Sequence, residues 1–175
     1  FAAQNQALPT KSLKCKYYGQ ASNMNCRVFG DKTETPLHIL AECCPLAPTE
    51  YKGRHDKVAA IVHRCLCQQF DIPVNEKWYQ HKPEKITENE KVKILWDCNI
   101  YTDKKIEARR PDILIVKKQS KQGFIIDINV PNDCRVVNNE TVKIVKYTEL
   151  KIELERIWQT HLTIIPIVIG ALGTI

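Results

Sequence analysis

The sequence lacks any hydrophobic segment long enough to cross a membrane, and its N-terminus lacks the apolar stretch of a secretory signal. The longest apolar run, residues 162–172, is eleven residues long and contains Pro166 and Gly170, which suits a buried strand better. Internal repeats and low-complexity segments are also absent. The chain does not begin with Met, and Phe1 falls in mid-pattern, so we expect a fragment of a longer protein. These absences argue against a membrane partner.

The composition is that of a globular protein with one ordinary core and room for a small additional module. Charged residues make up 26% and hydrophobic residues 43% of 175 residues. The formal net charge is +6. A phosphate-rich partner and a merely soluble basic surface are both compatible with this charge.

The hydrophobic pattern predicts an α/β fold. We expect helices at residues 55–70 and 138–161, strands at 93–97, 100–107, 113–116, 123–126 and 164–169, and a linking loop at 71–90. Helical spacing predicts two apolar stripes, one of Val58, Ile61, Val62, Cys65 and Leu66, and one of Ile144, Tyr147, Leu150, Leu154 and Ile157 or Trp158. A helix, several strands, a long helix and a last strand are typical of layered α/β domains.

Two carboxylates frame the predicted hairpin. If residues 113–116 and 123–126 pair as antiparallel strands, Asp112 falls opposite Asp127. Directly opposed like charges repel, so the pair needs a positive partner, and carboxylate oxygens suit a divalent cation such as Mg²⁺. The alternative is two unrelated, exposed strand-end residues. Our leading hypothesis is metal-dependent cleavage of phosphodiesters, with Asp112 and Asp127 as metal ligands.

Such nuclease chemistry also requires a cation near the attacked phosphate. Nuclease sites of this kind usually carry a lysine two residues after the second carboxylate, and that position is Asn129. Lys143 and Lys146 lie on adjacent turns of the next predicted helix and can reach the same space. A solvated helix face is the competing interpretation for both lysines. Asp97, Asp103 and Glu107 are weaker candidates for a further metal ligand.

A second candidate metal site lies in the region rich in Cys and His. Cys26, His38 and Cys43 have part of the spacing of a zinc knuckle, but the expected partner near Cys26 is replaced by Phe29. Cys15 or Cys44 is a candidate fourth ligand, and no zinc at all is the alternative. Without a secretory signal, metal ligands or free thiols are favoured over disulfides for the eight cysteines.

Basic residues near these motifs are candidate nucleic-acid contacts. Arg54 and His55 open the first long helix, where phosphate contact and a simple polar helix start are both plausible interpretations. Arg109 and Arg110 immediately precede the Pro111-Asp112 pair, so they are candidates for phosphate binding beside the proposed cleavage site.

Taken in order, these motifs resemble a known family. They are Ala7-Leu-Pro-Thr10, Cys26-Arg-Val-Phe-Gly30, Glu34-Thr-x-x-His38-Ile-Leu, Cys43-Cys-Pro45, Arg54-His55, Ile94-Leu-Trp-Asp97, Arg110-Pro-Asp-Ile113, Ile125-Ile-Asp127 and Lys143-x-x-Lys-Tyr147. The set is similar to the C-terminal region of arthropod non-LTR retrotransposon polyproteins that insert into ribosomal RNA genes. The resemblance covers nearly the whole chain, and Phe29 departs from it.

The resemblance implies a tail of an upstream region at 1–14, a zinc-knuckle-like module at 15–55 and a restriction-endonuclease-like domain at 56–175. The fold it implies is a mixed sheet flanked by helices. The implied activity is nicking of double-stranded target DNA for reverse transcription of element RNA, in the nucleus, downstream of a reverse transcriptase. Lys143 would be the catalytic lysine, with Lys146 the second choice, and Cys26, His38 and Cys43 the zinc ligands. A non-catalytic nucleic-acid-binding module and a junction resolvase are the alternatives.

Overall fold

The computed structural model describes residues 2–5, 7–19 and 23–174, and it divides the chain into two compact units. Unit 1 contains Phe1–Arg54, Val130–Val136 and Ile169–Ile175. Unit 2 contains His55–Asn129 and Val137–Val168. Within the described residues, no helix combines the length and the hydropathy that a membrane span requires.

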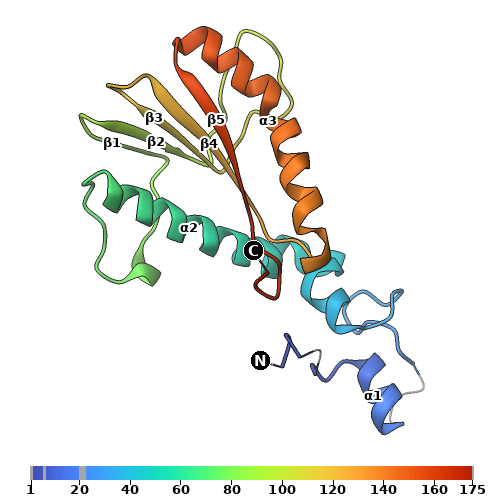
Figure 1. Cartoon of the computed structure of the whole chain (residues 1–175). Helices are drawn as coiled ribbons and strands as arrows, with labels where there is room; N and C mark the ends of the chain where they lie inside the picture. Colours follow the sequence, from blue (N-terminus) through green and yellow to red (C-terminus); the bar gives the residue numbers. More distant parts are fainter. Residues whose placement is uncertain (1, 6, 20–22, 175) are drawn as a thin grey trace. The chain divides into compact units, whose positions relative to one another are not determined.

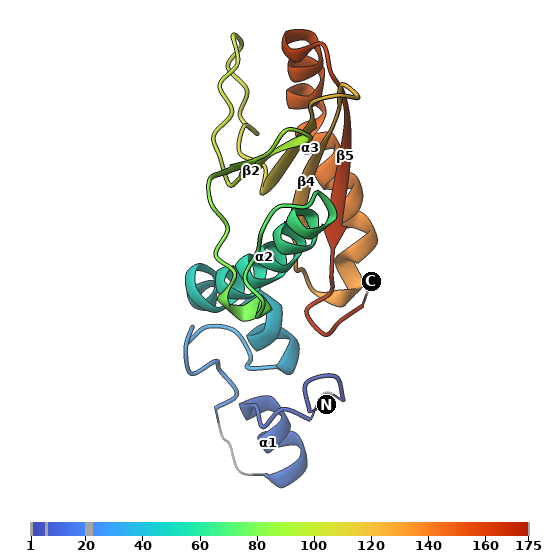
Figure 2. The same cartoon turned by 90° about the vertical axis from the view of Figure 1, so that its left-hand side faces the viewer.

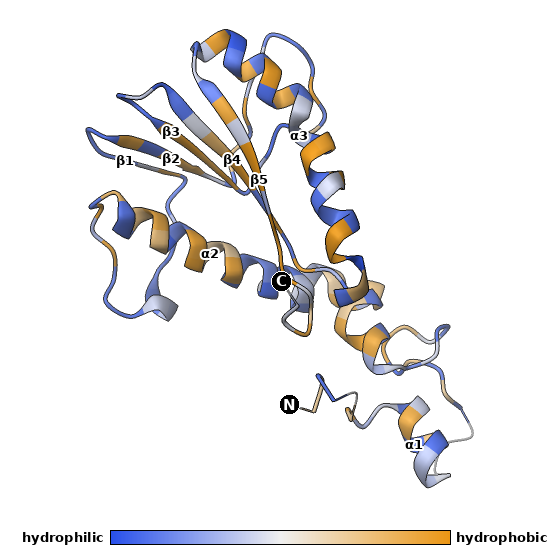
Figure 3. Cartoon of the chain, viewed as in Figure 1, coloured by the Kyte–Doolittle hydropathy of each residue, from blue (hydrophilic) through white to orange (hydrophobic). Residues whose placement is uncertain are grey.

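Unit 2 is built on a mixed five-stranded sheet, which confirms the α/β class. The strands lie in sequence order, and all neighbours are antiparallel except β4 and β5. Their hydrophobic residues concentrate in the centre of the sheet (Figure 3). The strands are β1 (Ile86–Glu88), β2 (Val92–Trp96), β3 (Ile113–Lys117), β4 (Gln122–Asn129) and β5 (His161–Val168).

The predicted hairpin register is confirmed. Ile113 pairs with Ile126, and this register places Asp112 and Asp127 at the next opposed positions. The pairing continues as far as Lys117 and Gln122, so the loop has four residues instead of the expected six. Its neighbour Gly123 has no room for a side chain, because a Cβ there would lie 2.6 Å from the carbonyl oxygen of Ile115.

Two helices, α2 (Lys52–Gln69) and α3 (Val136–Trp158), flank the sheet (Figures 1 and 2). α3 connects the parallel strands β4 and β5, as a crossover between parallel strands requires. It forms a core with one face of the sheet, and the members that are completely buried are Leu114, Ile125, Tyr147, Leu150, Leu154 and Leu162. The opposite face is filled by Ile94, Ile113, Ile115 and Ile128, the side on which α2 lies.

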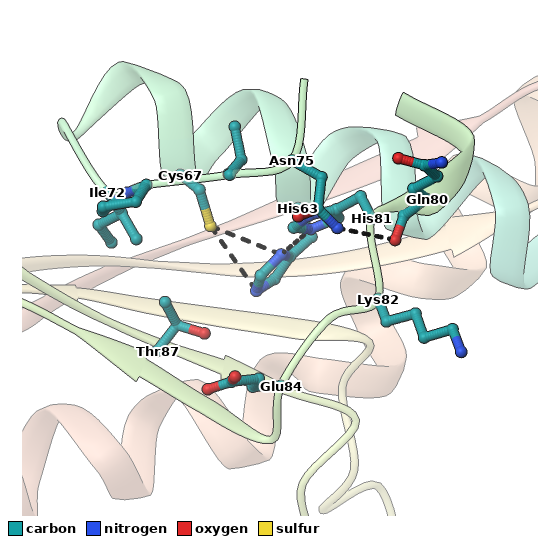
Figure 4. A pocket seen from close by; sticks show the side chains of 11 residues that line it. His63, Cys67, Ile72, Asn75, Gln80, His81, Lys82, Glu84 and Thr87 are labelled. Atoms are coloured by element: carbon teal, nitrogen blue, oxygen red, sulfur yellow. Dashed lines mark hydrogen bonds between the residues drawn. The ribbon is translucent and has the colours of Figure 1, made fainter. Parts of the chain in front are cut away.

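The predicted stripe of α2 is right in part: Val58, Val62 and Leu66 are half-buried, but the fully buried positions lie one residue further along the helix. The buried residues of α2 are Ala59, His63 and Cys67, whereas Ile61 and Cys65 are exposed. His63 caused the error, because a pattern that counts only apolar residues leaves a buried histidine out. Its ring lies against Cys67 and the ring of His81, and the Nδ1 atom of His63 is 2.9 Å from Nε2 of His81 (Figure 4).

Three other sequence predictions fail at least in part in unit 2. Residues 100–107 form an irregular loop instead of a strand, although Ile100 and Ile106 are buried in the core. Asp97, with a φ of 45°, turns the chain out of the sheet directly after β2. The predicted loop at 71–90 contains β1. In the α3 stripe Ile144 is exposed, and of the alternatives Ile157 and Trp158 it is Trp158 that packs against the core.

Unit 1 has little regular structure apart from α1 (Lys11–Tyr18). Short π-helical turns at His38–Glu42 and Ala47–Tyr51 flank a 3-10 turn at Cys44–Leu46. A buried carboxylate, Glu34, joins two of its segments by accepting hydrogen bonds from the backbone of Lys11 and the side chain of Arg27. The Arg27 hydrogen bond lowers the pKa of Glu34 to about 2. A loop-rich unit with so small a core depends on such polar links.

Candidate functional site

The centre of the candidate site is the carboxylate of Asp127, near the end of β4. The residue is only 2% exposed. Nζ of Lys143 lies 2.5 Å from its Oδ2 atom, and the hydroxyl of Tyr147 donates a hydrogen bond of 2.5 Å to Oδ1. Nζ of Lys146 is 3.5 Å from Oδ1 and donates to the Tyr147 hydroxyl at 2.9 Å. Two cations and a phenol therefore converge on one buried carboxylate.

The spacing along α3 explains this convergence. Lys146 and Tyr147 follow Lys143 by three and four residues, so the three side chains share one helix face. This face meets the end of β4, while the next turns contribute Leu150 and Leu154 to the core. The structure thus brings together both candidate lysines and Asp127.

Tyr147 is the functional residue that the sequence analysis missed. It was predicted as part of an apolar stripe, and its ring is completely buried, but its hydroxyl donates to Asp127 and lies 3.2 Å from the carbonyl oxygen of Arg110. Burial and the Asp127 hydrogen bond raise the pKa of Tyr147. A tyrosine in a buried stripe is itself a signal, because its hydroxyl requires a polar partner.

Asp112 lies at the start of β3 and contacts α2. Its Oδ2 atom accepts a hydrogen bond of 2.7 Å from the backbone N–H of Ile128 and lies 3.2 Å from Nε2 of His55. The other ring nitrogen of His55 is 3.0 Å from the carboxylate of Asp56. Hydrogen bonding to Asp112 raises the pKa of His55 to about 9. His55, a candidate phosphate contact by sequence, therefore lies beside the first carboxylate.

The other basic candidates are placed differently. Arg110 is exposed and makes two bonds of 2.6 Å to the carboxylate of Asp97, which lower the pKa of Asp97. Arg109 is exposed in the loop after Ile106. Arg54 belongs to unit 1, where it donates to the carbonyl of Leu40 and lies over the ring of Tyr51.

The weaker metal-ligand candidates are also occupied or exposed. Asp97 is paired with Arg110 and with Lys85. Asp103 accepts a hydrogen bond of 2.8 Å from Arg156, and Glu107 is exposed in the same loop. Of the candidate carboxylates, Asp112 and Asp127 are therefore the two that lie at opposed ends of neighbouring strands.

The oxygen atoms at this edge of the sheet are of the kind that hard divalent cations prefer. They belong to the carboxylates of Asp112 and Asp127 and to the carbonyl of Ile128. The Ile128 carbonyl oxygen and Oδ2 of Asp112 each lie 3.2 Å from Nε2 of His55. Both carboxylates influence Tyr147, since each contributes to raising its pKa. Carboxylate and carbonyl oxygens are ligand types that Mg²⁺ accepts, and the amine of Lys143 balances the charge of Asp127.

Unit 1 contains a Cys/His cluster that can hold a metal ion. Ligand atoms of Cys26, His38 and Cys43 lie within 4.8 Å of one another, and no other group of three is found in the described part of the chain. All three residues are at most 3% exposed. The cluster is compatible with zinc, which binds thiolate and imidazole ligands.

The surroundings of the cluster favour bound metal over an ordinary core. Neither ring nitrogen of His38 has a hydrogen-bond partner in the structure, although both are buried. The sulfur of Cys26 accepts backbone hydrogen bonds of 3.4 Å from Val28 and Phe29 and lies 3.9 Å from the sulfur of Cys43. Burial opposes ionisation, but these hydrogen bonds lower the pKa of Cys26. A zinc ion would satisfy both the imidazole and the thiolate.

Neither predicted candidate supplies a fourth ligand to this cluster. Phe29 sits in the turn that follows Cys26, with its ring 6.2 Å from the His38 ring. Cys44 is exposed and Cys15 is half-buried, and neither belongs to the cluster.

No protein-family model matches this sequence, and no curated protein matches it significantly.

Proposed function

We propose that this chain is a metal-dependent DNA endonuclease from a retrotransposon polyprotein, and that it nicks target DNA to prime reverse transcription. The observation that carries the proposal is the hairpin register, which places Asp112 opposite Asp127, with Lys143, Lys146 and Tyr147 directed at Asp127 from α3. Opposed carboxylates beside a lysine suit metal-assisted hydrolysis of a phosphodiester. The ordered motifs of the sequence support the retrotransposon origin.

In this proposal Asp112 and Asp127 hold Mg²⁺, which supplies polarisation of the phosphate and activation of water when bound. Lys143 stabilises the charge that develops on the attacked phosphate, from the position beside Asp127 that it already holds. Tyr147 orients the Asp127 carboxylate through its hydroxyl. Arg109 and Arg110, exposed next to Asp112, contact the DNA backbone.

The same proposal gives unit 1 a zinc ion bound by Cys26, His38 and Cys43. The ion would stabilise the fold of this unit, because it would bind one of the two buried ring nitrogens of His38 that have no partner. By the resemblance, the partners of the whole protein are double-stranded DNA in ribosomal RNA genes and the element RNA, and the protein acts in the nucleus.

A non-catalytic nucleic-acid-binding module is the second candidate function. It is favoured by the burial of Asp127, whose carboxylate is already engaged by Lys143 and Tyr147 as in a structural ion pair. In that case the polar cluster serves only to fix α3 to the sheet.

A plasmid-nicking assay on the whole chain separates the two candidates. We expect conversion of supercoiled to open-circular DNA with Mg²⁺ and none with EDTA. Asp112→Asn and Asp127→Asn should abolish nicking, while Asp71→Asn, a change at an exposed carboxylate on the same unit, should leave it unchanged. DNA binding without nicking by the wild-type protein would exclude the endonuclease and support the binding module.

A further inference from the structure

The ring of His55 lies against two oxygen atoms of the sheet. Its Nε2 atom lies 3.2 Å from Oδ2 of Asp112 and 3.2 Å from the carbonyl oxygen of Ile128. Asp112 immediately precedes β3, and Ile128 belongs to β4, next to Asp127. One N–H group thus faces a carboxylate and a carbonyl together.

The two oxygen atoms are held in place independently of His55. The backbone N–H of Ile128 donates to Oδ2 of Asp112 at 2.7 Å, and Ile128 is itself fixed in β4 by its pairing with β5. The spacing between carboxylate and carbonyl is therefore set by the sheet. A carboxylate oxygen and a backbone carbonyl are ligands that a hard divalent cation accepts.

We propose that the His55 side chain competes with the divalent cation for the oxygens of Asp112 and Ile128, and that it moves away when the cation binds. The inference rests in part on the proposed function, because it assigns a regulatory contact to the same site. It makes His55 a positioning residue of the metal-free form. In that form its N–H satisfies the carboxylate that the cation later takes over.

The surroundings of His55 allow it to leave. Its side chain is 28% exposed, and the carboxylate that contacts its other nitrogen, that of Asp56, is 47% exposed. A rotation about its side-chain bonds would carry the ring into solvent while α2 stays in place. Lys143 differs, because its side chain is only 18% exposed and its amine is only 2.5 Å from Asp127. His55 is thus the more readily moved of these two groups.

The difference between Asp112 and Asp127 supports this division of roles. Asp127 is neutralised from α3 by lysines and by the Tyr147 hydroxyl. At Asp112 the side-chain contacts come from His55 and the Ile128 amide. Removing the imidazole therefore exposes the oxygens of Asp112 without disturbing the cluster around Asp127.

Binding of Mn²⁺ to the whole chain, followed by loss of the free-ion electron paramagnetic resonance signal, tests the proposal directly. Mn²⁺ prefers oxygen ligands and stands in for Mg²⁺. Asp112→Asn defines the site, since a cation held there must be lost in this variant. We expect His55→Ala to bind Mn²⁺ about tenfold more tightly than the wild type, which corresponds to about 1.4 kcal/mol.

Two further variants make the result specific. His55→Asn, whose shorter side chain does not reach both oxygens, should show the same gain in affinity. His161→Ala, which removes a histidine whose side chain is 73% exposed on β5, should not change it. Thermal unfolding of each variant gives the amount of folded protein used to calculate affinity.

The outcomes separate this inference from the proposed function. If Asp112→Asn lowers Mn²⁺ affinity but neither His55 variant raises it, the competing role of His55 is wrong and the cation site stands. If the wild type binds no Mn²⁺ that depends on Asp112, the cation site itself is wrong, and with it the endonuclease proposal.

Discussion

The hydroxyl of Tyr147 donates a 2.5 Å hydrogen bond to Oδ1 of Asp127, so a helix residue fixes the carboxylate at the end of a strand. This contact joins the hydrophobic core to the candidate site, because the same ring is completely buried among Leu150 and Ile125. The orientation of Asp127 therefore depends on the packing of α3 against the sheet.

Tyr147→Phe should lower the nicking rate about 10- to 100-fold, the range for losing a residue that orients a metal ligand. It should also lower the free energy of unfolding by about 1–2 kcal/mol, since Asp127 loses a buried donor. Nicking and thermal unfolding measure the two effects. Tyr101→Phe, at a tyrosine that is 82% exposed, is the matched control. An unchanged nicking rate in Tyr147→Phe would contradict the orienting role.

The two lysines should differ in importance. Lys143 is closer to Asp127 and more buried than Lys146, whose side chain is 42% exposed. We expect Lys143→Met to reduce the nicking rate about 100-fold or more, as for loss of a group that stabilises the transition state. Lys146→Met should cost less. Lys151→Met, farther along α3, serves as control. The reverse order would assign the catalytic role to Lys146.

Phe29→Cys should strengthen zinc binding in unit 1. The variant adds a thiolate at the turn whose backbone already donates to Cys26. Zinc affinity should rise at least about tenfold, since four ligands together contribute about 10–16 kcal/mol in structural sites. Competition with a chromophoric chelator measures affinity, and the Co²⁺ spectrum reports the added sulfur. Val28→Cys adds a thiol at the adjacent, exposed position and should not have this effect. Equal, tight binding by the wild type would mean that Cys15 or Cys44 completes the site.

Unit 2 should lose stability in mild acid because of His63. Burial and the nearby His81 lower the pKa of His63 to about 4, below its ordinary value of 6.5. The folded state therefore binds fewer protons than the unfolded chain between these values, so the contribution of His63 is complete above pH 6.5 and is lost as the pH falls to about 4. The loss should reach about 2–3 kcal/mol.

Chemical unfolding between pH 7 and pH 4 measures this loss. His63→Leu should flatten the dependence of the free energy of unfolding on pH, because a leucine binds no proton. His161→Leu, at the exposed histidine on β5, is the control for replacing a histidine by leucine. If His63→Leu retains the wild-type slope, other groups are responsible for the acid sensitivity.

The sequence predicted the parts of unit 2 that have a strong local pattern. Two short apolar segments around a polar turn have few ways to pair, so the opposition of Asp112 and Asp127 followed from counting residues. α3 was predicted nearly to its ends because its apolar residues recur at helical spacing.

The errors arose where burial does not follow hydrophobicity. His63 is buried and Ile61 exposed, because contact with the His81 ring and the shape of the sheet outweigh the apolar pattern. Residues 100–107 were predicted as a strand, yet they form a loop whose Ile100 and Ile106 side chains are buried in the core. Such choices depend on partners far along the chain, which a local pattern does not contain.

The sequence by itself therefore determined which carboxylates oppose each other, which lysines follow them, and which cysteines and histidine form a metal-ligand set. Only the tertiary structure decided that both lysines and the Tyr147 hydroxyl meet Asp127, and that His55 reaches Asp112 and the carbonyl of Ile128. The reason is physical. Strand register and helix periodicity are fixed by local backbone geometry, whereas the face that a helix turns toward a sheet is set by packing among distant side chains.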